Sequence, residues 1–205
     1  MTTLYIIRHG ESRGNLEDRF VGYSDWGLTE KGFEQARRLG EYMKGVEIDA
    51  VYSSDLIRAV DTAKPFADYK GLHIIKRKDL REINGGDWEE MTFEEISKRN
   101  PEEFAAWKYD FLNAITIGGE TIRELSERVY REMDKIAREN DGKRVAVVFH
   151  ATAIKVFLDR LGDHDGWVPN ASVTTVSYEN GKFSVTDKGY ADFLDGLITV
   201  LNADL

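Results

Sequence analysis

Two uninterrupted apolar runs, residues 4–7 and 145–149, are the clearest feature of the chain. Such a run is typical of a strand that is buried on both faces, as in the middle of a parallel sheet. Shorter apolar runs at residues 50–52 and 73–75 predict two further strands. Longer stretches with helical spacing separate these runs, and this alternation favours an α/β fold.

Helical spacing of apolar residues, together with recognisable start signals, predicts helices between the strands. Thr29 is expected to cap a helix whose apolar face comprises Phe33, Ala36, Leu39 and Met43. Pro65 is expected to kink or end the next helix. Capping boxes that begin at Thr92 and Thr121 open two more helices, the first of them interrupted at Asn100-Pro101.

The C-terminal part of the chain predicts one more helix and a β-hairpin. Residues 153–161 form the helix that follows the second apolar strand. Two alternating runs, residues 173–178 and 182–186, flank Asn180-Gly181, a sequence typical of a type I′ turn. These elements sum to one α/β domain over residues 1–205, with a mostly parallel sheet and an antiparallel strand at its edge.

Composition and charge narrow the class of protein. The 205 residues carry a formal net charge of −9, which argues against a nucleic-acid partner. No apolar run approaches the ~18 residues of a membrane helix, and the chain enters its first strand without a signal peptide, so we expect no membrane partner. The lack of cysteine excludes disulfides and thiolate catalysis and fits a cytoplasmic location.

Both long apolar strands are followed directly by a histidine, and this repetition is the strongest sign of chemistry. His9 follows the first strand with Arg8 before it, and His150 follows the second. Ligands bind at the carboxyl ends of strands in open α/β sheets, so the two histidines could share a site. Arg58, in the first turn of a helix, could join them. The same pattern also fits a purely structural interpretation, in which the histidines are hydrogen-bonded at the rim of the sheet and the arginine is solvated. The shared site and the structural interpretation therefore both stay open.

The segment Arg-His-Gly-Glu-Ser-x-x-Asn at residues 8–15 resembles the signature of the histidine phosphatase superfamily, also called the phosphoglycerate mutase-like family. Five further segments resemble motifs of that family and occur in its order: residues 28–36, 52–63, 80–89, 118–121 and 147–150. From these motifs the chain is identified as a member of the histidine phosphatase superfamily. The resemblance implies a three-layer αβα sandwich in which residues 88–120 form a cap over the pocket.

The resemblance also assigns roles to particular side chains. It makes His9 the nucleophile, which takes the phosphoryl group on a ring nitrogen, and Glu82 the proton donor to the leaving alcohol. The implied catalytic residues are Arg8, His9, Arg58, Glu82 and His150. The implied substrate- and phosphate-binding residues are Arg8, Asn15, Gly22, Arg58, His150 and Ala151. Because arginines and a histidine supply the positive charge, neither a metal ion nor a cofactor is expected.

Some residues depart from the family pattern. Ala151 stands where the family usually has glycine after the second histidine, and Glu90 stands where glycine often follows Trp-Glu. The chain ends in an apolar stretch, residues 193–201, for which a homodimer contact, a packed tail and a lid are all open. The pKa of Glu82 depends on two opposing effects, because burial would raise it and nearby cations would lower it.

These features favour a metal-independent phosphomonoesterase that acts through phosphohistidine on a small phosphorylated metabolite. A phosphoglycerate mutase is the first alternative, but family mutases look longer and carry an Arg pair after the glutamate motif. The short segment between Trp88 and Gly118 contains no such pair. A non-catalytic relative that only binds a phosphorylated ligand is the second alternative. The identity of the phosphate monoester stays open among α-ribazole phosphate, phosphoserine, sugar phosphates and phosphoglycerate.

Overall fold

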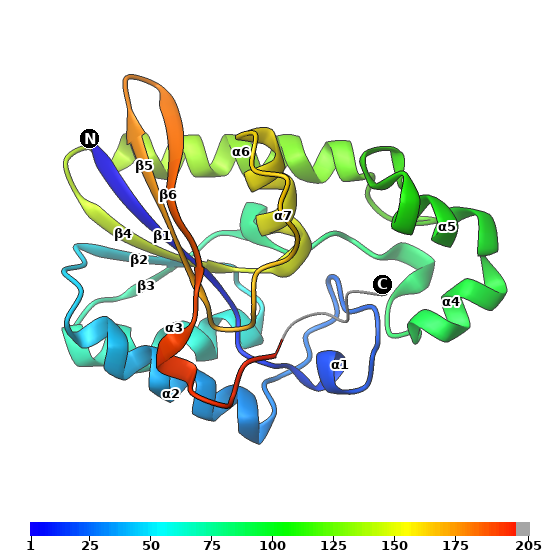
Figure 1. Cartoon of the computed structure of the whole chain (residues 1–205), viewed down its shortest axis with the longest axis horizontal. Helices are drawn as coiled ribbons and strands as arrows, with labels where there is room; N and C mark the ends of the chain where they lie inside the picture. The colour runs from blue at the N-terminus through cyan, green and yellow to red at the C-terminus, as the bar shows by residue number, and fades with distance from the viewer. Residues whose placement is uncertain (200–205) are drawn as a thin grey trace.

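A computed structural model describes residues 1–199, and a central sheet with the strand order β3-β2-β4-β1-β5-β6 organises these residues (Figure 1). Strands β3, β2, β4 and β1 run parallel, and β5 is antiparallel to both of its neighbours. The strands span Thr2–Arg8 (β1), Ala50–Ser53 (β2), Ile74–Lys76 (β3), Arg144–Phe149 (β4), Val173–Glu179 (β5) and Lys182–Tyr190 (β6). The mostly parallel sheet with an antiparallel strand is thus confirmed.

Helices cover both faces of the sheet and complete the three layers. Helices α2 and α3 pack in one apolar cluster with Ile7 and Val148, whereas α6 and α7 pack in another with Ile6 and Val147. Helices α4 and α5 extend beyond the sheet (Figure 1). The helices within residues 1–199 are Arg13–Leu16 (α1), Glu30–Lys44 (α2), Ile57–Lys70 (α3), Phe93–Arg99 (α4), Pro101–Tyr109 (α5), Ile122–Glu139 (α6) and Ala151–Arg160 (α7).

Strands β1 and β4 lie side by side in parallel, and this pairing brings their two histidines together. Their apolar side chains alternate between the two clusters, so both strands are buried on both faces. Arg8 pairs with Phe149 in the register, and the His9 N–H donates to the Phe149 carbonyl at 3.0 Å. His9 and His150 therefore leave the sheet at adjacent positions of its carboxyl edge.

Several sequence predictions about the helices are confirmed, one is wrong, and for Pro65 one of the two expected outcomes is excluded. Thr29, Thr92 and Thr121 cap α2, α4 and α6 with their side chains. Helix α3 does not end at Pro65 but continues to Lys70. The proline removes one helical hydrogen bond, but the next turn is buried against α2 and keeps the chain helical. Phe33 was expected on the buried face of α2, yet it is 53% exposed.

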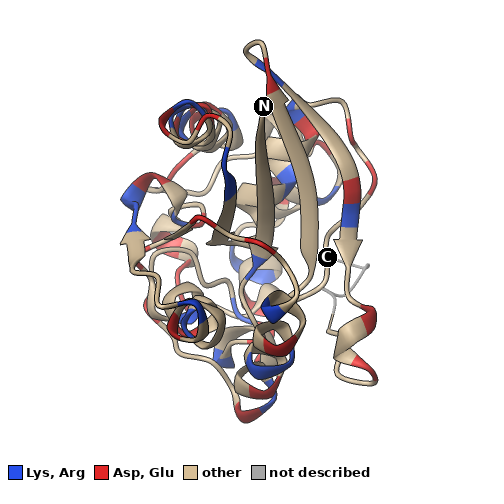
Figure 2. Ribbon diagram, turned by 90° about the vertical axis from the view of Figure 1, so that its left-hand side faces the viewer, with Lys and Arg blue, Asp and Glu red and all other residues tan. Residues whose placement is uncertain are grey.

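Acidic and basic residues are interspersed on the same helices (Figure 2). Two examples are the exposed pairs Lys64 with Asp68 on α3 and Arg138 with Asp134 on α6. Within residues 1–199, every helix is too short or too polar to cross a lipid bilayer.

The apolar C-terminal stretch packs on the domain as far as the structure describes it. The Phe193 ring stacks on Tyr42 of α2 with centroids 4.7 Å apart. The Gln35 side-chain amide donates to the Leu197 carbonyl at 2.7 Å, and the Thr199 hydroxyl lies 3.0 Å from a Glu11 carboxylate oxygen. Residues 193–199 therefore form a packed tail, and the last two residues of the stretch lie outside the described residues.

Candidate active site

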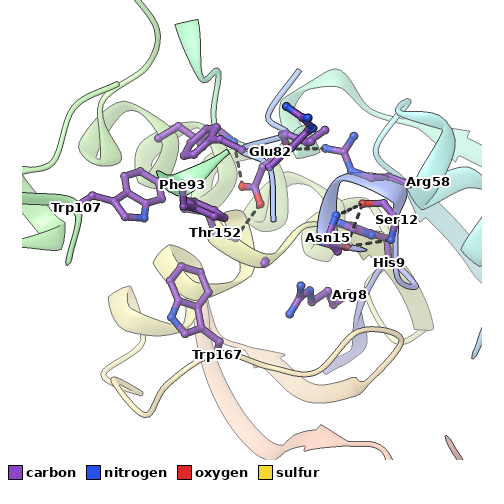
Figure 3. A pocket seen from close by; sticks show the side chains of 15 residues that line it. Arg8, His9, Ser12, Asn15, Arg58, Glu82, Phe93, Trp107, Thr152 and Trp167 are labelled. Carbon is purple, nitrogen blue, oxygen red and sulfur yellow. Dashed lines mark hydrogen bonds between the residues drawn. The ribbon is translucent and has the colours of Figure 1, made fainter. Parts of the chain in front are cut away.

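The rings of His9 and His150 lie together at the carboxyl edge of the sheet, with centroids 5.1 Å apart. His9 lines a pocket together with Arg8, Asn15 and Arg58 (Figure 3). His150 is fully buried beside His9 and is not among the residues that line the pocket. The hypothesis of a shared site, rather than two separate rim histidines, therefore agrees with the geometry.

The His9 ring is held in one tautomer by its own neighbour. Its Nδ1 lies 2.7 Å from the Gly10 carbonyl oxygen, which can only accept, so Nδ1 carries the proton. The lone pair is therefore on Nε2. Burial and the positive charges of Arg58 and Arg8 hold the pKa of His9 well below its usual range. At neutral pH the ring is therefore uncharged.

Two buried arginines place positive charge next to the His9 ring. Arg8 donates from Nη1 to the Val168 carbonyl at 2.8 Å, and Arg58 donates to carbonyls of the loop at residues 21–24. Within residues 1–199 neither guanidinium forms an ion pair. Burial lowers the pKa of each to about 10, and the charge of Glu82 opposes this shift. Both arginines therefore stay charged at neutral pH.

Three buried nitrogen atoms beside His9 have no hydrogen-bond partner among the described residues: Arg8 Nε and both ring nitrogens of His150. Burial, followed by the charge of Arg58, holds the pKa of His150 well below its ordinary value. Each buried polar atom without a partner costs about 1–3 kcal/mol. A neutral imidazole has one N–H, so an oxyanion could accept from Arg8 Nε and from one of the two ring nitrogens of His150.

The Glu82 carboxylate lies at the N-terminus of α7. Its Oε2 accepts from the Thr152 N–H at 2.9 Å, and its Oε1 accepts from the Ala153 and Ile83 N–H groups, both at 3.0 Å. These bonds and the charge of Arg58 favour the ionised carboxylate, but burial outweighs them and raises the pKa of Glu82. The question that the sequence left open is decided in favour of burial.

The remaining expected binding residues differ in what they offer. The Asn15 carbonyl oxygen accepts from the Ser12 N–H at 3.0 Å, which leaves the amide NH₂ of Asn15 to donate into the pocket. Ala151 lines the pocket as the first residue of α7 and has no left-handed φ, so alanine fits there without strain. Gly22 is not among the lining residues; its N–H donates to Glu89 and its carbonyl accepts from Arg58.

Further pocket residues were not singled out from the sequence. They come from the N-cap of α1, the loop after α1, the Glu82 loop, α7 and the loop after α7: Ser12, Arg19, Phe20, Val21, Ile83, Thr152 and Trp167. Phe93 and Trp107, which belong to the expected cap, face Trp167 across the outer part of the pocket (Figure 3). Trp167 directly precedes Val168, whose carbonyl accepts from Arg8, but nothing in the sequence marked Trp167 as a pocket residue.

Within residues 1–199, no group of three or more His, Asp or Glu side chains is arranged to hold a metal ion. The pocket instead gathers an uncharged imidazole, two guanidinium groups and a carboxyl group with a raised pKa. These features define an α/β protein with a pocket at the carboxyl edge of its sheet that contains two buried positive charges.

Comparison with known proteins identifies the family. The family model of the histidine phosphatase superfamily (branch 1) matches residues 4–189, and the chain belongs to this superfamily. The Bacillus subtilis protein named uncharacterized phosphatase PhoE is 30% identical over 203 residues, covering 97% of this chain and 100% of that protein.

Two solved structures show the same fold. Bacillus stearothermophilus YhfR matches with a TM-score of 0.90 and 32% identity, over 95% of this chain and 100% of that one. The phosphoglycerate mutase from Bacillus anthracis strain Sterne matches with a TM-score of 0.83 and 31% identity, over 96% of each chain. Similar proteins thus carry both phosphatase and mutase names.

Proposed function

We propose that the protein is a metal-independent phosphomonoesterase that forms a phosphohistidine on His9. The supporting observation is the fixed tautomer of His9, with its Nε2 lone pair next to two buried, charged arginines. Phosphoryl transfer depends mainly on positioning and on stabilising negative charge, and this pocket supplies both.

In the first half-reaction, Nε2 of His9 attacks phosphorus while the bond from phosphorus to the ester oxygen breaks. Arg8, Arg58 and the Asn15 amide hold the three non-bridging oxygens. The protonated Glu82 gives its proton to the departing oxygen, so the product leaves as a neutral alcohol. His150 is outside the lining of the empty pocket, but its ring lies beside that of His9, so its N–H, which has no partner among the described residues, donates to the phosphoryl group once that group is on His9.

In the second half-reaction, the Glu82 carboxylate takes a proton from water as the water oxygen attacks phosphorus. The bond between phosphorus and Nε2 breaks, His9 returns to its neutral state, and inorganic phosphate leaves. Glu82 then holds the proton that the next cycle needs, so one group serves as acid and then as base.

The test is hydrolysis of p-nitrophenyl phosphate by protein that has been dialysed against EDTA. We expect turnover with EDTA present and no gain when Mg²⁺ or Mn²⁺ replaces the chelator, because the arginines provide the charge. Loss of turnover in EDTA that a divalent metal restores would disprove metal independence. No turnover under any condition would favour a relative that only binds phosphorylated ligands.

A phosphoglycerate mutase is the second candidate, favoured by the similar Bacillus anthracis structure. The cations of the segment after Glu82, which are Lys98, Arg99 and Lys108, do not line the pocket. Arg19 does, but its guanidinium already bonds the Glu17 carboxylate and the Glu90 carbonyl. Incubation with 3-phosphoglycerate, primed with bisphosphoglycerate, separates the two activities, since a mutase yields 2-phosphoglycerate and a phosphatase yields inorganic phosphate.

The outer part of the pocket points to a substrate with an apolar or aromatic alcohol. Its walls include Phe20, Phe93, Trp107 and Trp167 (Figure 3). Contact with an aromatic ring contributes about 1 kcal/mol beyond area burial. Aryl phosphates should therefore be better substrates than small polar phosphates.

Replacing Trp167 with alanine should lower kcat/KM for an aryl phosphate about fivefold to tenfold, because one wall of the outer pocket is lost. The value for glycerol phosphate should change much less. Trp167 suits this test because it is only half-buried, whereas Trp107 belongs to the apolar core. Tyr109→Ala is the control, since that ring is 83% exposed and outside the pocket. Equal losses for both substrates would contradict the aromatic subsite.

A further inference from the structure

The Glu89 carboxylate collects hydrogen bonds from the loop beside the pocket. Its Oε2 accepts from the Gly22 N–H at 3.2 Å, the Ser24 N–H at 3.1 Å and the Ser24 hydroxyl at 2.7 Å. Its Oε1 accepts from the Tyr23 N–H at 2.7 Å and the Gly85 N–H at 2.8 Å. One half-buried carboxylate therefore fixes three consecutive peptide groups of this loop.

The carbonyl groups of the same loop hold the guanidinium of Arg58. Arg58 Nη2 donates to the Gly22 carbonyl at 2.8 Å and to the Val21 carbonyl at 3.2 Å, and Nη1 donates to the Ser24 carbonyl at 2.9 Å. The N–H groups of residues 22–24 thus bond a negative group, and carbonyl groups of residues 21–24 bond a positive one. In this series of hydrogen bonds, the backbone of the loop connects Glu89 to Arg58.

Two glycines leave the space that this arrangement needs. A Cβ atom on Gly22 would lie 2.4 Å from Glu89 Oε1 and 2.0 Å from the Ile83 carbonyl oxygen. A Cβ atom on Gly85 would lie 2.9 Å from Glu89 Oε1. Such distances do not occur between real atoms, so the carboxylate can approach the backbone only because both residues are glycine.

We propose that Glu89 is a positioning residue for Arg58, acting through the backbone of residues 21–24. The inference rests on the proposed function, in which Arg58 holds a phosphoryl oxygen. Glu89 itself does not line the pocket, so it does not touch the substrate. Without the Glu89 carboxylate, the loop loses the acceptor that orients its peptide groups. Its three carbonyl groups then no longer hold the Arg58 guanidinium in one fixed position.

The substitution Glu89→Gln tests this role with almost no change in size. An amide NH₂ would replace one oxygen and face N–H donors whichever way the amide is turned. We expect kcat/KM for p-nitrophenyl phosphate to fall about 10- to 100-fold, approaching the loss of a direct stabilising group. Glu94→Gln is the matched control and should leave kcat/KM unchanged, because Glu94 is exposed and its one ion pair within residues 1–199 is with Lys98.

A double-mutant cycle with Arg58→Ala distinguishes positioning from general destabilisation. If Glu89 acts through Arg58, Glu89→Gln should cost little once Arg58 is gone, and the double variant should match Arg58→Ala. Losses that multiply in the double variant would overturn the proposal, as would wild-type activity in a folded Glu89→Gln protein. Should Glu89→Gln fail to fold, Ser24→Ala takes its place, since it removes only the 2.7 Å hydroxyl bond; it should cost a few-fold and also lose its effect without Arg58.

A readout without turnover separates this proposal from the proposed function. Inorganic phosphate should raise the melting temperature of the wild type and of Glu94→Gln, because the anion binds the folded pocket. The increase should be smaller for Glu89→Gln and Arg58→Ala, and equal in the double variant and Arg58→Ala. An inactive wild type would disprove the phosphatase, whereas a full phosphate shift in Glu89→Gln would disprove the positioning role.

Discussion

Replacing His9 with alanine is expected to reduce the turnover of p-nitrophenyl phosphate by about 10⁴-fold or more, since loss of the nucleophile removes the covalent route. The pocket would keep its two arginines, so inorganic phosphate should still bind to the variant. The direct measurement is rapid quenching of the wild type with a ³²P-labelled substrate. Protein-bound label that is stable in base and lost in acid is expected, as for a phosphohistidine.

His164→Ala is the matched control for this substitution. The His164 side chain is 73% exposed and does not line the pocket, so its removal should leave turnover unchanged. Activity of His9→Ala within tenfold of the wild type would rule out His9 as the nucleophile. A wild type that turns over without ever carrying acid-labile label would argue for direct attack by water.

The substitution Glu82→Gln should lower kcat/KM for an alkyl phosphate about 10²- to 10⁴-fold, because the departing alkoxide loses its proton donor. The loss should be much smaller for p-nitrophenyl phosphate, whose leaving group is stable without a proton. This contrast between two substrates is an internal control, since a misfolded or displaced pocket would reduce both rates alike. Equal losses would reject Glu82 as the acid.

The pH dependence of the same reaction follows from the raised pKa of Glu82. The first step needs the protonated form, so kcat/KM for the alkyl phosphate should be full below that pKa and fall as pH rises through it. Because burial raises the pKa, the fall should come at a higher pH than an exposed glutamate would give. In Glu82→Gln this limb of the profile should vanish, and its persistence would assign the limb to another group.

Periodicity and position alone made a shared site at the strand ends one of two open interpretations. The apolar runs of β1 and β4 had to be buried on both faces, so their carboxyl ends had to meet at one edge of the sheet. That argument placed His9 beside His150, and the helix after β2 brought Arg58 to the same edge. The family resemblance was needed for Glu82, because nothing in its charged neighbourhood marks it as buried.

Features that depend on contacts between distant segments could not be predicted. Helix α7 begins at Ala151 rather than at Ala153 because the Glu82 carboxylate, remote in sequence, accepts the first N–H groups. The exposure of Phe33 and the continuation of α3 through Pro65 also depend on tertiary packing, because α2 and α3 pack against each other and against the sheet. Trp167 lies in a loop whose sequence has no periodicity.

One departure from the family pattern does carry strain. Glu90, where glycine is common, adopts a φ of 67°, in the left-handed region that favours glycine. Its neighbours hold it there, since the Glu90 N–H donates to the Phe20 carbonyl and its carbonyl accepts from Arg19. Ala151, in contrast, costs nothing, because its position is the regular first turn of a helix.

The placement of Glu82 at the start of α7 has a consequence for the energetics of each turnover. The aligned peptide dipoles of a helix produce a partial positive charge at its N-terminus, worth roughly 1–2 kcal/mol to a partly buried anion there. In the proposed reaction, Glu82 releases its proton to the departing alcohol, and the new negative charge then forms at that end of α7. The helix thus stabilises the deprotonated acid as the ester bond breaks, and the same interaction must be overcome when water returns the proton.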